Sequence, residues 1–390
     1  MLALFPDSKS FVLSDSPSAL GVLVCERDGI APFAEGAYIR RLSLVADAIG
    51  IALVVFAPWT WDARSDSVRG WTWNKREQRW IARARKLPRV VYDRAWPATE
   101  VEKRRFQVAL GRIRAARALI FLNSRLPHKG KVGEMLARDP AYAALVPPTA
   151  PYKGPHSLRA WLREHDGSAF LKPVAGSQGK RVISYKRDND GKVELAGRTS
   201  SNRSFSFTAA TEQDALNRLH RWIGSHAYIM QPLLELHTAD GKPFDLRSLL
   251  QKNKSGRWTV TGVAARVGAA GTVTANLHGG GRAMHPGDVL EPLLGEERAR
   301  TVEQRIRAIS LRLASWCEES FGRFAEIGLD FGVDRSGKLW FLEANSKPGR
   351  AAMGSAGKEA TQQAVVRPLS YASTILLRPS GRVIHEFDHL

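Results

Sequence analysis

Apolar runs separated by polar turn residues predict a regular succession of strands and helices at the start of the 390-residue chain. Residues 21–29 are typical of a strand, a helix is expected around residues 36–49, and a second strand over residues 51–58. Two strands joined by a helix form the βαβ unit of α/β proteins. The pattern therefore predicts an α/β domain in the first part of the chain.

Two later patterns predict β-hairpins. Within residues 168–185, an apolar strand is followed by a Gly-rich loop and by a second apolar strand. Further on, strands over residues 327–333 and 338–342 flank a turn that contains Gly337. Short apolar runs on either side of a Gly-containing turn are typical of antiparallel strand pairs.

The second hairpin carries three oxygen-bearing side chains. Glu343 and Asn345 lie two residues apart, so they leave an extended chain on the same face. On the partner strand, Asp330 stands between Leu329 and Phe331 and points away from both, so it can share that face. Two carboxylates and one amide suit Mg²⁺ bound to a polyphosphate. The alternative is the polar edge of a strand that runs into a turn.

The first hairpin contains a candidate phosphate-binding loop. Its first strand ends at Lys172, and the loop that follows contains Gly176, Ser177, Gln178 and Gly179. Backbone N–H groups of such a loop can close on phosphate oxygens, and lysines add point charges. The loop is not a Walker A motif, because Val174 and Arg181 stand where that motif requires Gly and Ser or Thr. An ordinary surface hairpin with lysines is the alternative.

Other polar residues lie on or beside apolar strands between the two hairpins. Asp245 and Arg247 share one face of an alternating strand, and Gln231 is followed by a proline that interrupts another strand. Arg266 lies near a strand end, and Asn276 lies just before a run of glycines. Taken alone, each is better explained as a solvated strand or loop residue.

In chain order, these segments resemble the ATP-grasp superfamily. The patterns "DLR", "QKN", "EIGLD" and "NSKPGR" are similar to its YheC/YheD branch, which is associated with endospore coats. The resemblance covers residues 172–350, and a weaker one reaches back to residues 90–94 and 121–130. It implies an α/β (α+β) ATP-grasp fold, in which two α+β subdomains clasp ATP and a Rossmann-like pre-ATP-grasp domain precedes them. The implied parts are a Rossmann-like domain over 1–115, a central subdomain over 116–225, a C-terminal subdomain over 226–355 and a packed tail over 356–390.

The resemblance also implies ATP and Mg²⁺ as cofactors. The implied ATP-binding residues are Lys129 and Lys172 at the phosphates, Gly176, Ser177, Gln178 and Gly179 in the lid, Gln231, Pro232, Leu233 and Leu234 at the adenine, and Asp245 and Asn276. The implied metal ligands are Asp330, Glu343 and Asn345, while Arg247 and Arg266 would face the reacting carboxyl-phosphate as catalytic residues. Many amide-ligase relatives carry an arginine two residues before the first metal aspartate, where this chain has Gly328. Either Arg266 does that work here, or the substrate differs.

The implied activity is that of an ATP-dependent carboxylate–amine ligase that releases ADP and works through an acyl phosphate. Its partners would be ATP, a carboxylate substrate and an amine acceptor, with an acidic peptide or a cell-wall- or spore-related substrate favoured. The alternative, from another class, is a non-catalytic or weakly ATP-binding spore-surface or nucleic-acid-binding module that retains the fold. The presence of Lys172, Asp330, Glu343 and Asn345 favours the enzyme.

Composition agrees with a cytoplasmic enzyme. Hydrophobic residues make up 44% and charged residues 25% of the chain, which is ordinary for a soluble globular protein. No apolar run has the length of a membrane span, and the first residues lack the basic start and long apolar centre of a signal peptide. Cys25 and Cys317 predict neither a disulfide framework nor a metal site. We therefore expect a cytoplasmic protein and leave spore association open.

The net charge of +20 exceeds what ATP binding requires, so either an acidic partner or high arginine usage in a GC-rich genome explains it.

Six of the 11 tryptophans lie between Trp59 and Trp96 among arginines and lysines. This pattern fits the stacking of nucleic acid bases, but a tryptophan core covered by long cationic side chains is favoured. A basic helix over residues 104–119 and a packed helix or strand over residues 365–377 are also expected. We expect nucleic acid binding to be weak or absent, and a homo-oligomer remains open.

Overall fold

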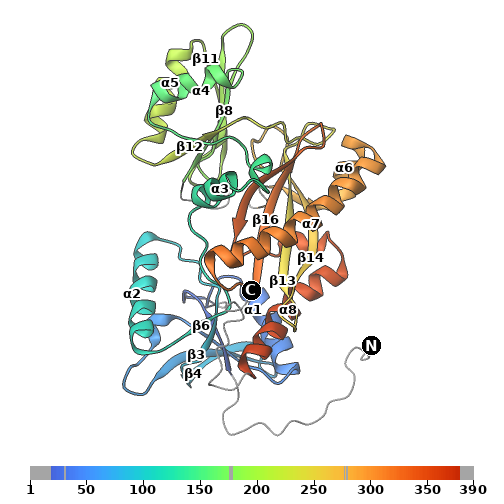
Figure 1. Ribbon diagram of the computed structural model, residues 1–390. Coiled ribbons are helices and arrows are strands. Elements are labelled where there is room, and N and C mark those ends of the chain that lie inside the picture. The colour runs from blue at the N-terminus through green and yellow to red at the C-terminus, as the bar shows by residue number, and fades with distance from the viewer. Residues whose placement is uncertain (1–18, 30–31, 175–178, 276, 278–279, 378–390) are drawn as a thin grey trace. The chain divides into compact units, whose positions relative to one another are not determined.

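The chain divides into two units, and each of them is assembled from separate segments of the sequence. The computed structural model describes residues 19–29, 32–174, 179–275, 277 and 280–377 (Figure 1). Unit 1 comprises residues 1–123, 253–256 and 365–390, and unit 2 comprises residues 124–252 and 257–364.

Unit 1 contains a six-stranded sheet with the order β4-β3-β2-β1-β5-β6. Its strands are β1 (Ala19–Leu23), β2 (Ala52–Phe56), β3 (Ser67–Asn74), β4 (Arg79–Lys86), β5 (Val90–Asp93) and β6 (Ile120–Phe121). Strand β1 pairs in parallel with β2 and with β5, and helix α1 (Gly36–Ala48) joins β1 to β2, which confirms the predicted βαβ start. Strand β1 ends earlier than predicted, before the charged residues Glu26, Arg27 and Asp28.

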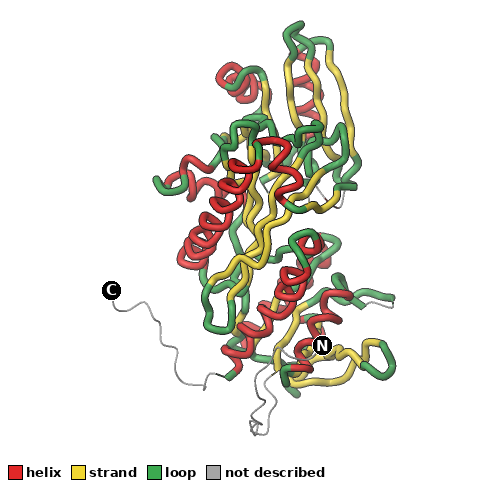
Figure 2. The backbone as a smooth tube through the Cα atoms, turned by 90° about the vertical axis from the view of Figure 1, so that its right-hand side faces the viewer, coloured by secondary structure: helices red, strands yellow, loops and turns green. Residues whose placement is uncertain are grey.

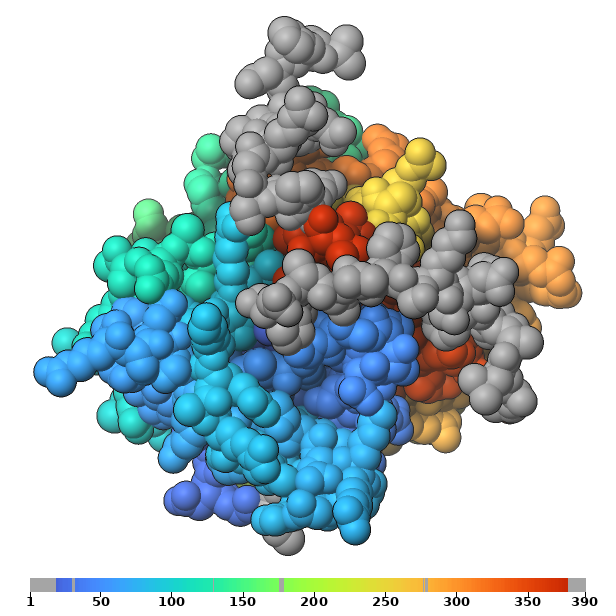
Figure 3. Space-filling view, turned by 90° about the horizontal axis from the view of Figure 1, so that it is seen from below, coloured from blue at the N-terminus to red at the C-terminus, as the bar shows by residue number. Residues whose placement is uncertain are grey.

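Helix α2 (Glu100–Ala116) follows β5 and confirms the predicted basic helix with an earlier start. Thr99 caps it, because its side-chain oxygen accepts the N–H of Glu102. Phe106, Leu110 and Ile113 recur at helical spacing and are buried. The opposite side of α2 carries exposed arginines. The part of unit 1 that precedes α2 forms the blue surface in Figure 3.

The tryptophan-rich segment forms the antiparallel β3–β4 hairpin and the short 3-10 helix η1 (Pro58–Thr60). Trp80 is buried and makes edge-to-face contacts with Phe33 and Trp73. The guanidinium of Arg40 lies over the ring of Trp73. This part of the segment therefore agrees with the interpretation as a tryptophan core covered by cations.

The first sheet of unit 2 has the order β11-β10-β9-β8-β12-β7. Its strands are β7 (Ala150–Pro151), β8 (Ser168–Pro173), β9 (Ile183–Arg187), β10 (Val193–Arg198), β11 (Ser204–Ala209) and β12 (Tyr228–Gln231). The antiparallel pairing of β8 with β9 confirms the first predicted hairpin. Helices α4 (Pro155–Glu164) and α5 (Glu212–Ile223) contribute buried side chains to its core, while α3 (Lys129–Arg138) and η2 (Ala143–Leu145) belong to the core of the other sheet.

The second sheet of unit 2 has the order β15-β14-β13-β16-β17 and carries the predicted metal ligands and catalytic arginines. Its strands are β13 (Phe244–Lys252), β14 (Trp258–Val267), β15 (Arg282–Met284), β16 (Glu326–Val333) and β17 (Leu339–Asn345). The pairing of β16 with β17 confirms the second predicted hairpin. The long helix α7 (Glu296–Phe321), preceded by α6 (Pro286–Leu294), crosses one face of the strands and closes a large apolar core (Figures 1 and 2). Any active site on this sheet must therefore use its other face.

The tail predicted to pack as a helix or strand is helical. Helix α8 (Lys358–Leu376) follows the 3-10 helix η4 (Ala351–Gly354) and passes from unit 2 into unit 1 at residues 364–365.

Cys25 and Cys317 are buried in separate core clusters and form no disulfide with each other. Among the described residues, no helix combines the length and the apolarity that crossing a membrane requires.

Candidate active site

The face of the second sheet of unit 2 that lies opposite α7 gathers the charged residues singled out in the sequence. Leu329 and Phe331 on β16 belong to the α7 core, so Asp330 between them lies on the opposite face. In the same way, Phe244 and Leu246 of β13 belong to that core, which leaves the residues that alternate with them on the face of Asp330. These residues are Asp245 and Arg247. In the register of the sheet, Arg247 stands opposite Asp330 and Asp245 stands opposite Arg266.

An irregularity in the β16–β17 ladder brings Glu343 onto this face. Phe331 pairs with Phe341, but Asp330 pairs with Glu343, so Leu342 is an extra residue on β17. Such a bulge reverses the alternation of the residues that follow it. Ala344 accordingly packs against the α7 core. Strict alternation would have put Glu343 on the same side as Phe341, whereas the bulge places it beside Asp330.

Two arginines and two aspartates form a connected ion-pair network. Arg247 donates to Asp330 through Nε and through Nη2, the latter at 2.8 Å from Oδ2. Arg266 donates to Asp245 through Nε at 2.5 Å and through Nη2 at 2.8 Å. Arg266 Nη2 also lies 2.8 Å from Asp330 Oδ2, which links the two pairs. Asp330 is only 2% exposed, so removing either of its partners would leave a buried charge.

Burial and neighbouring charges shift the pKa values of this network in different directions. For Asp330, burial favours the neutral form, but Arg247 and Arg266 hold the pKa of its carboxyl well below the usual range. Burial, reinforced by the charge of Asp330, raises the pKa of Asp245 to about 6 against the opposing influence of Arg266. Burial alone would lower the pKa of Arg266, but the two aspartates raise it above its ordinary value. Asp330 therefore stays ionised, and Asp245 is the carboxyl of the network that gains a proton most readily.

Glu343 and Asn345 complete the set of oxygen donors. Asn345 Nδ2 donates to Glu343 Oε1 at 2.9 Å, so the amide oxygen of Asn345 is not used in that bond. A carboxylate offers about four lone-pair positions, so Asp330 can keep its arginines and still face a cation. Within the described ranges, no three His, Cys, Asp or Glu side chains are grouped to hold a metal ion. The donors that fit Mg²⁺ here are thus two carboxylates and one amide, completed by ligand and water oxygens.

Gly328 is enclosed by the loop after β17 and by Arg247. It lies opposite Asn345 in the ladder, and a Cβ atom added to it would lie 2.8 Å from the Cβ of Pro348. The same Cβ would lie 3.4 Å from Nη1 of Arg247. The loop after β17 therefore packs directly on this glycine, and no arginine fits there unless the loop moves.

A second group of predicted residues lies on or beside the other sheet of unit 2. Lys172 is half-buried on β8 and stands opposite Ile229 of β12. Gln231 ends β12, as predicted from the proline that follows it, and its Nε2 donates to Thr149 Oγ1 at 2.8 Å. Pro232, Leu233 and Leu234 lie, half-buried, in the connection from β12 to β13. Gly179 has a φ of 62°, a backbone conformation that favours glycine.

Some predicted residues lie outside the described part of the chain. They are Gly176, Ser177 and Gln178 of the lid, and Asn276. Lys129 is the first residue of α3, but its side chain is not among the described atoms. The roles assigned to these five residues, like those of the other site residues, remain predictions.

Sequence reasoning gave no role to Arg350, which fixes the loop after β17. Its Nη2 donates to Glu326 Oε2 at 2.5 Å, and its Nε donates to the carbonyl of Ala364 at 3.1 Å. Glu326 is completely buried and also accepts Gln251 Nε2 at 3.0 Å. A glutamate that opens a buried strand is the signal that could have identified this anchor, because such a carboxylate needs a cation.

Sequence reasoning also missed Arg198, a buried arginine at the end of β10. It is 1% exposed, and its Nε donates to Thr274 Oγ1 at 2.9 Å while its Nη1 donates to the carbonyl of Asn202 at 3.1 Å. Its Nη2 has no hydrogen-bond partner, and no carboxylate pairs with it among the described residues. Burial lowers the pKa of its guanidinium. A buried cation without a counter-charge is costly, and an anionic ligand would offset this cost.

Comparisons with known proteins are consistent with this architecture. The family model described as YheC/D like ATP-grasp matches residues 118–375. The endospore coat-associated protein YheC of Bacillus subtilis (strain 168) is 23% identical over 337 residues, which cover 86% of this chain and 91% of YheC. The endospore coat-associated protein YheD of the same organism is 28% identical over 281 residues, which cover 71% of this chain and 60% of YheD. Among solved structures, D-cycloserine synthetase DcsG has a similar fold, with a TM-score of 0.53, 15% identity and coverage of 92% of this chain and 100% of that one.

Proposed function

Because the chain belongs to the YheC/D-like ATP-grasp family, we propose that it is an ATP-dependent ligase that joins a carboxylate to an amine through an acyl phosphate. The strongest support is the convergence of Arg247, Arg266 and Asp330 with Glu343 on one face of a sheet. Such a face can attract a cation and an anion at the same time. This is what a reaction between a metal-bound triphosphate and a carboxylate needs.

We assign the charges of this face to separate tasks. Asp330, Glu343 and Asn345 would hold Mg²⁺, which supplies charge neutralisation on the β- and γ-phosphates and aligns them. Lys172 and Gly179, with the predicted lid residues, would bind the phosphates, and residues 231–234 would contact the adenine. Arg266, which is held in place by Asp245, would face the reacting carboxyl group. A preorganised arginine needs no reorganisation when negative charge develops.

The proposed reaction has two steps. A carboxylate oxygen of the substrate attacks the γ-phosphorus, ADP leaves, and an acyl phosphate forms. The amine nitrogen then attacks the acyl carbon, inorganic phosphate leaves and the nitrogen releases a proton, which forms an amide or peptide-type bond. Exclusion of water by the predicted lid would protect the acyl phosphate from hydrolysis. The two Bacillus subtilis relatives are endospore coat-associated proteins, which supports a spore-related substrate. The net charge of +20 supports an acidic one, such as an acidic peptide.

Trapping with hydroxylamine tests the chemistry without knowledge of the amine. Pools of candidate acids, including acidic amino acids, poly-glutamate and cell-wall peptides, are supplied with MgATP and hydroxylamine. We expect the correct acid to raise the release of ADP and phosphate and to give a hydroxamate in matching amount. Release of AMP and pyrophosphate would instead mean adenylation. ADP release without a hydroxamate for any acid would contradict the ligase and favour a kinase or an ATPase.

A further inference from the structure

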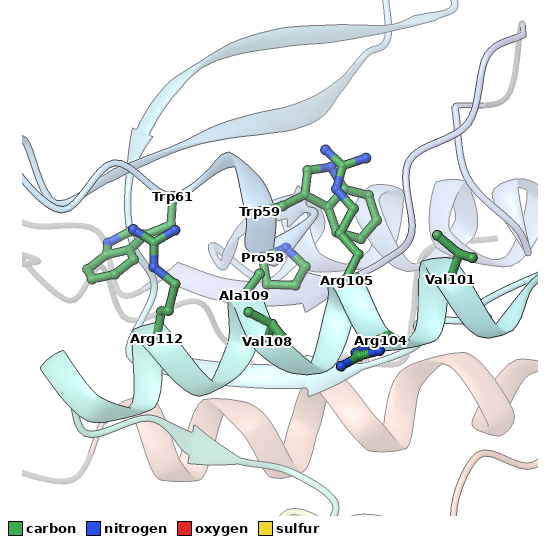
Figure 4. A pocket seen from close by; sticks show the side chains of 9 residues that line it. All are labelled: Pro58, Trp59, Trp61, Val101, Arg104, Arg105, Val108, Ala109 and Arg112. Atoms are coloured by element: carbon green, nitrogen blue, oxygen red, sulfur yellow. The ribbon is translucent and has the colours of Figure 1, made fainter.

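A groove in unit 1 is lined by apolar side chains and by arginines (Figure 4). Its volume is about 600 Å³, and it lies between α2 and the 3-10 helix η1. The residues that line it are Pro58, Trp59, Trp61, Val101, Arg104, Arg105, Val108, Ala109 and Arg112. Six of the nine are apolar, the other three are arginines, and none is acidic. A ligand that matches this groove must carry negative charge and apolar surface together.

The α2 side of the groove is an exposed stripe, distinct from the side that packs on the core. Val101, Arg105, Val108 and Arg112 follow one another at spacings of three or four residues, so they lie along one side of the helix. The exposed fractions are 80% for Val101 and 60% for Val108, which is unusual for valine. Because the core-facing residues of α2 lie on the other side of the helix, the valines contribute nothing to the core.

The opposite wall of the groove is held rigid by the packing of its tryptophans. Trp59 and Trp61 both pack against the core cluster of unit 1. The indole N–H of Trp61 donates to Asp66 Oδ1 at 3.2 Å, and Asp66 in turn accepts Arg117 Nε at 3.1 Å. Two fixed rings thus face an exposed helix stripe, which preorganises the groove for a ligand.

Arg105 stands over the face of Trp59, with 4.5 Å between its guanidinium carbon and the ring centroid (Figure 4). A guanidinium stacked in this way keeps its in-plane N–H groups for a carboxylate, and it holds a fixed geometry for two parallel hydrogen bonds. Arg104 and Arg112 are exposed along the same helix, two turns apart. The groove therefore offers cations at two levels, with the side chain of Val108 between them and that of Val101 beyond them.

We infer that this groove binds an acidic polypeptide segment in which carboxylates alternate with apolar side chains. Carboxylates would pair with Arg104, Arg105 and Arg112, while apolar side chains would cover the valines and Pro58. The match in charge is the main support, since all charged residues that line the groove are arginines and the net charge of the chain is +20. Neither the groove nor its charge depends on the proposed ligase activity, so binding alone tests it.

A single-stranded nucleic acid fits this groove less well than a peptide. Sequence-independent nucleic acid binding uses open aromatic faces on which bases stack. Here Arg105 already covers Trp59, and the most exposed apolar groups are the aliphatic side chains of Val101 and Val108. Aliphatic surface suits peptide side chains better than it suits bases.

The test measures the fluorescence anisotropy of three labelled probes with the full chain at physiological ionic strength. The probes are a short peptide of alternating glutamate and leucine, an all-glutamate peptide of the same length, and oligothymidylate. The variant Arg104→Ala/Arg112→Ala removes two charges from the groove. The control Arg83→Ala/Arg85→Ala removes two exposed charges from β4, outside the groove. A third variant, Val108→Asp, changes the apolar stripe.

We expect the glutamate–leucine peptide to bind best, about tenfold more weakly to the Arg104/Arg112 variant, and equally well to the control. Val108→Asp should also weaken the binding of this peptide. If both double variants lose affinity for the peptide equally, binding depends only on the general positive charge, and the proposal is overturned. Preferred binding of oligothymidylate that depends on Arg104 and Arg112 would replace the peptide by nucleic acid. Absence of binding by all three probes would also overturn the proposal. Thermal unfolding of each variant is measured as well, because an unchanged transition excludes loss of the fold as the cause of weaker binding.

Discussion

Arg266 Nη2 lies 2.8 Å from Asp330 Oδ2, and the same guanidinium holds Asp245 in a two-point hydrogen bond. One arginine on β14 thus ties together carboxylates from β13 and β16. Because Asp330 is also held by Arg247, its carboxylate is fixed on both sides before any ligand arrives. The charges on this face are therefore held in fixed positions.

Replacing Glu343 by glutamine should weaken the binding of MgATP. The change keeps the volume of the side chain but removes a negative charge opposite Asp330, at the proposed metal position. We expect about a ten- to a hundredfold rise in the Kd of MgATP in calorimetric titration. The control Glu194→Gln removes an exposed carboxylate from β10 and should leave the Kd unchanged. If both variants bind MgATP like the wild type, Glu343 is not a metal ligand.

The Asp330 network should make stability depend on pH on the acid side. Arg247 and Arg266 hold the pKa of Asp330 below its ordinary value, so this contribution is fully present above about pH 4 and is lost as the pH falls through the lowered pKa. At neutral pH, Asp330→Asn should lower the free energy of unfolding by about 3–5 kcal/mol, because two buried arginines lose charge compensation. In urea unfolding, the difference in the free energy of unfolding between wild type and variant should become smaller as the pH is lowered. A constant gap would mean that Asp330 does not titrate as its contacts require.

Adding a methyl group at Gly328 should lower stability and disturb the proposed metal site. The new Cβ would lie 2.8 Å from the Cβ of Pro348, so the loop after β17 must shift, and Asn345 stands opposite Gly328. We expect Gly328→Ala to lower the free energy of unfolding by about 1–3 kcal/mol and to weaken MgATP binding. Gly349→Ala is the matched control in the same loop, because nothing lies within 4 Å of its Cβ position. Equal thermal unfolding of the two variants would contradict the packing described here.

Replacing Arg198 by methionine should separate stability from nucleotide binding. The buried guanidinium has no carboxylate partner among the described residues, so an apolar side chain of similar length should leave the free energy of unfolding unchanged or raise it. If an anion offsets this charge, the affinity for MgATP should fall, since Thr274, to which Arg198 donates, lies two residues before Asn276. Arg203→Met, at an exposed position in the connection between β10 and β11, serves as the control. Loss of stability without loss of affinity would make Arg198 a structural residue only.

The alternation of apolar and polar residues predicted the main features of the site face. Both hairpins lie where the sequence placed them, and Asp330 points away from Leu329 and Phe331 as expected. These predictions succeed because side chains in a strand must alternate between two faces, and apolar burial decides which face is which.

The remaining features depend on contacts between distant residues. The bulge at Leu342 leaves no mark in the local pattern, since an extra residue is visible only when the partner strand is in place. Likewise, Arg198 ends a short strand as a solvated arginine would, and only the fold shows that it is buried. The arginines assigned to the reacting carboxyl also pair with Asp245 and Asp330, which side-chain spacing alone does not indicate.

The two units cannot be completed in the order in which their first residues are synthesised. Unit 1 needs residues 253–256 and the end of α8 in addition to residues 1–123, and Thr374 Oγ1 donates to the carbonyl of Lys254 within it. Synthesis proceeds at about 5–20 residues per second, so residues 365–377 emerge roughly 10–50 seconds after residues 19–123. Unit 2, whose segments end at residue 364, is finished earlier. The part of unit 1 that is made first is therefore completed last, when residues 253–256 and the end of α8 are also present.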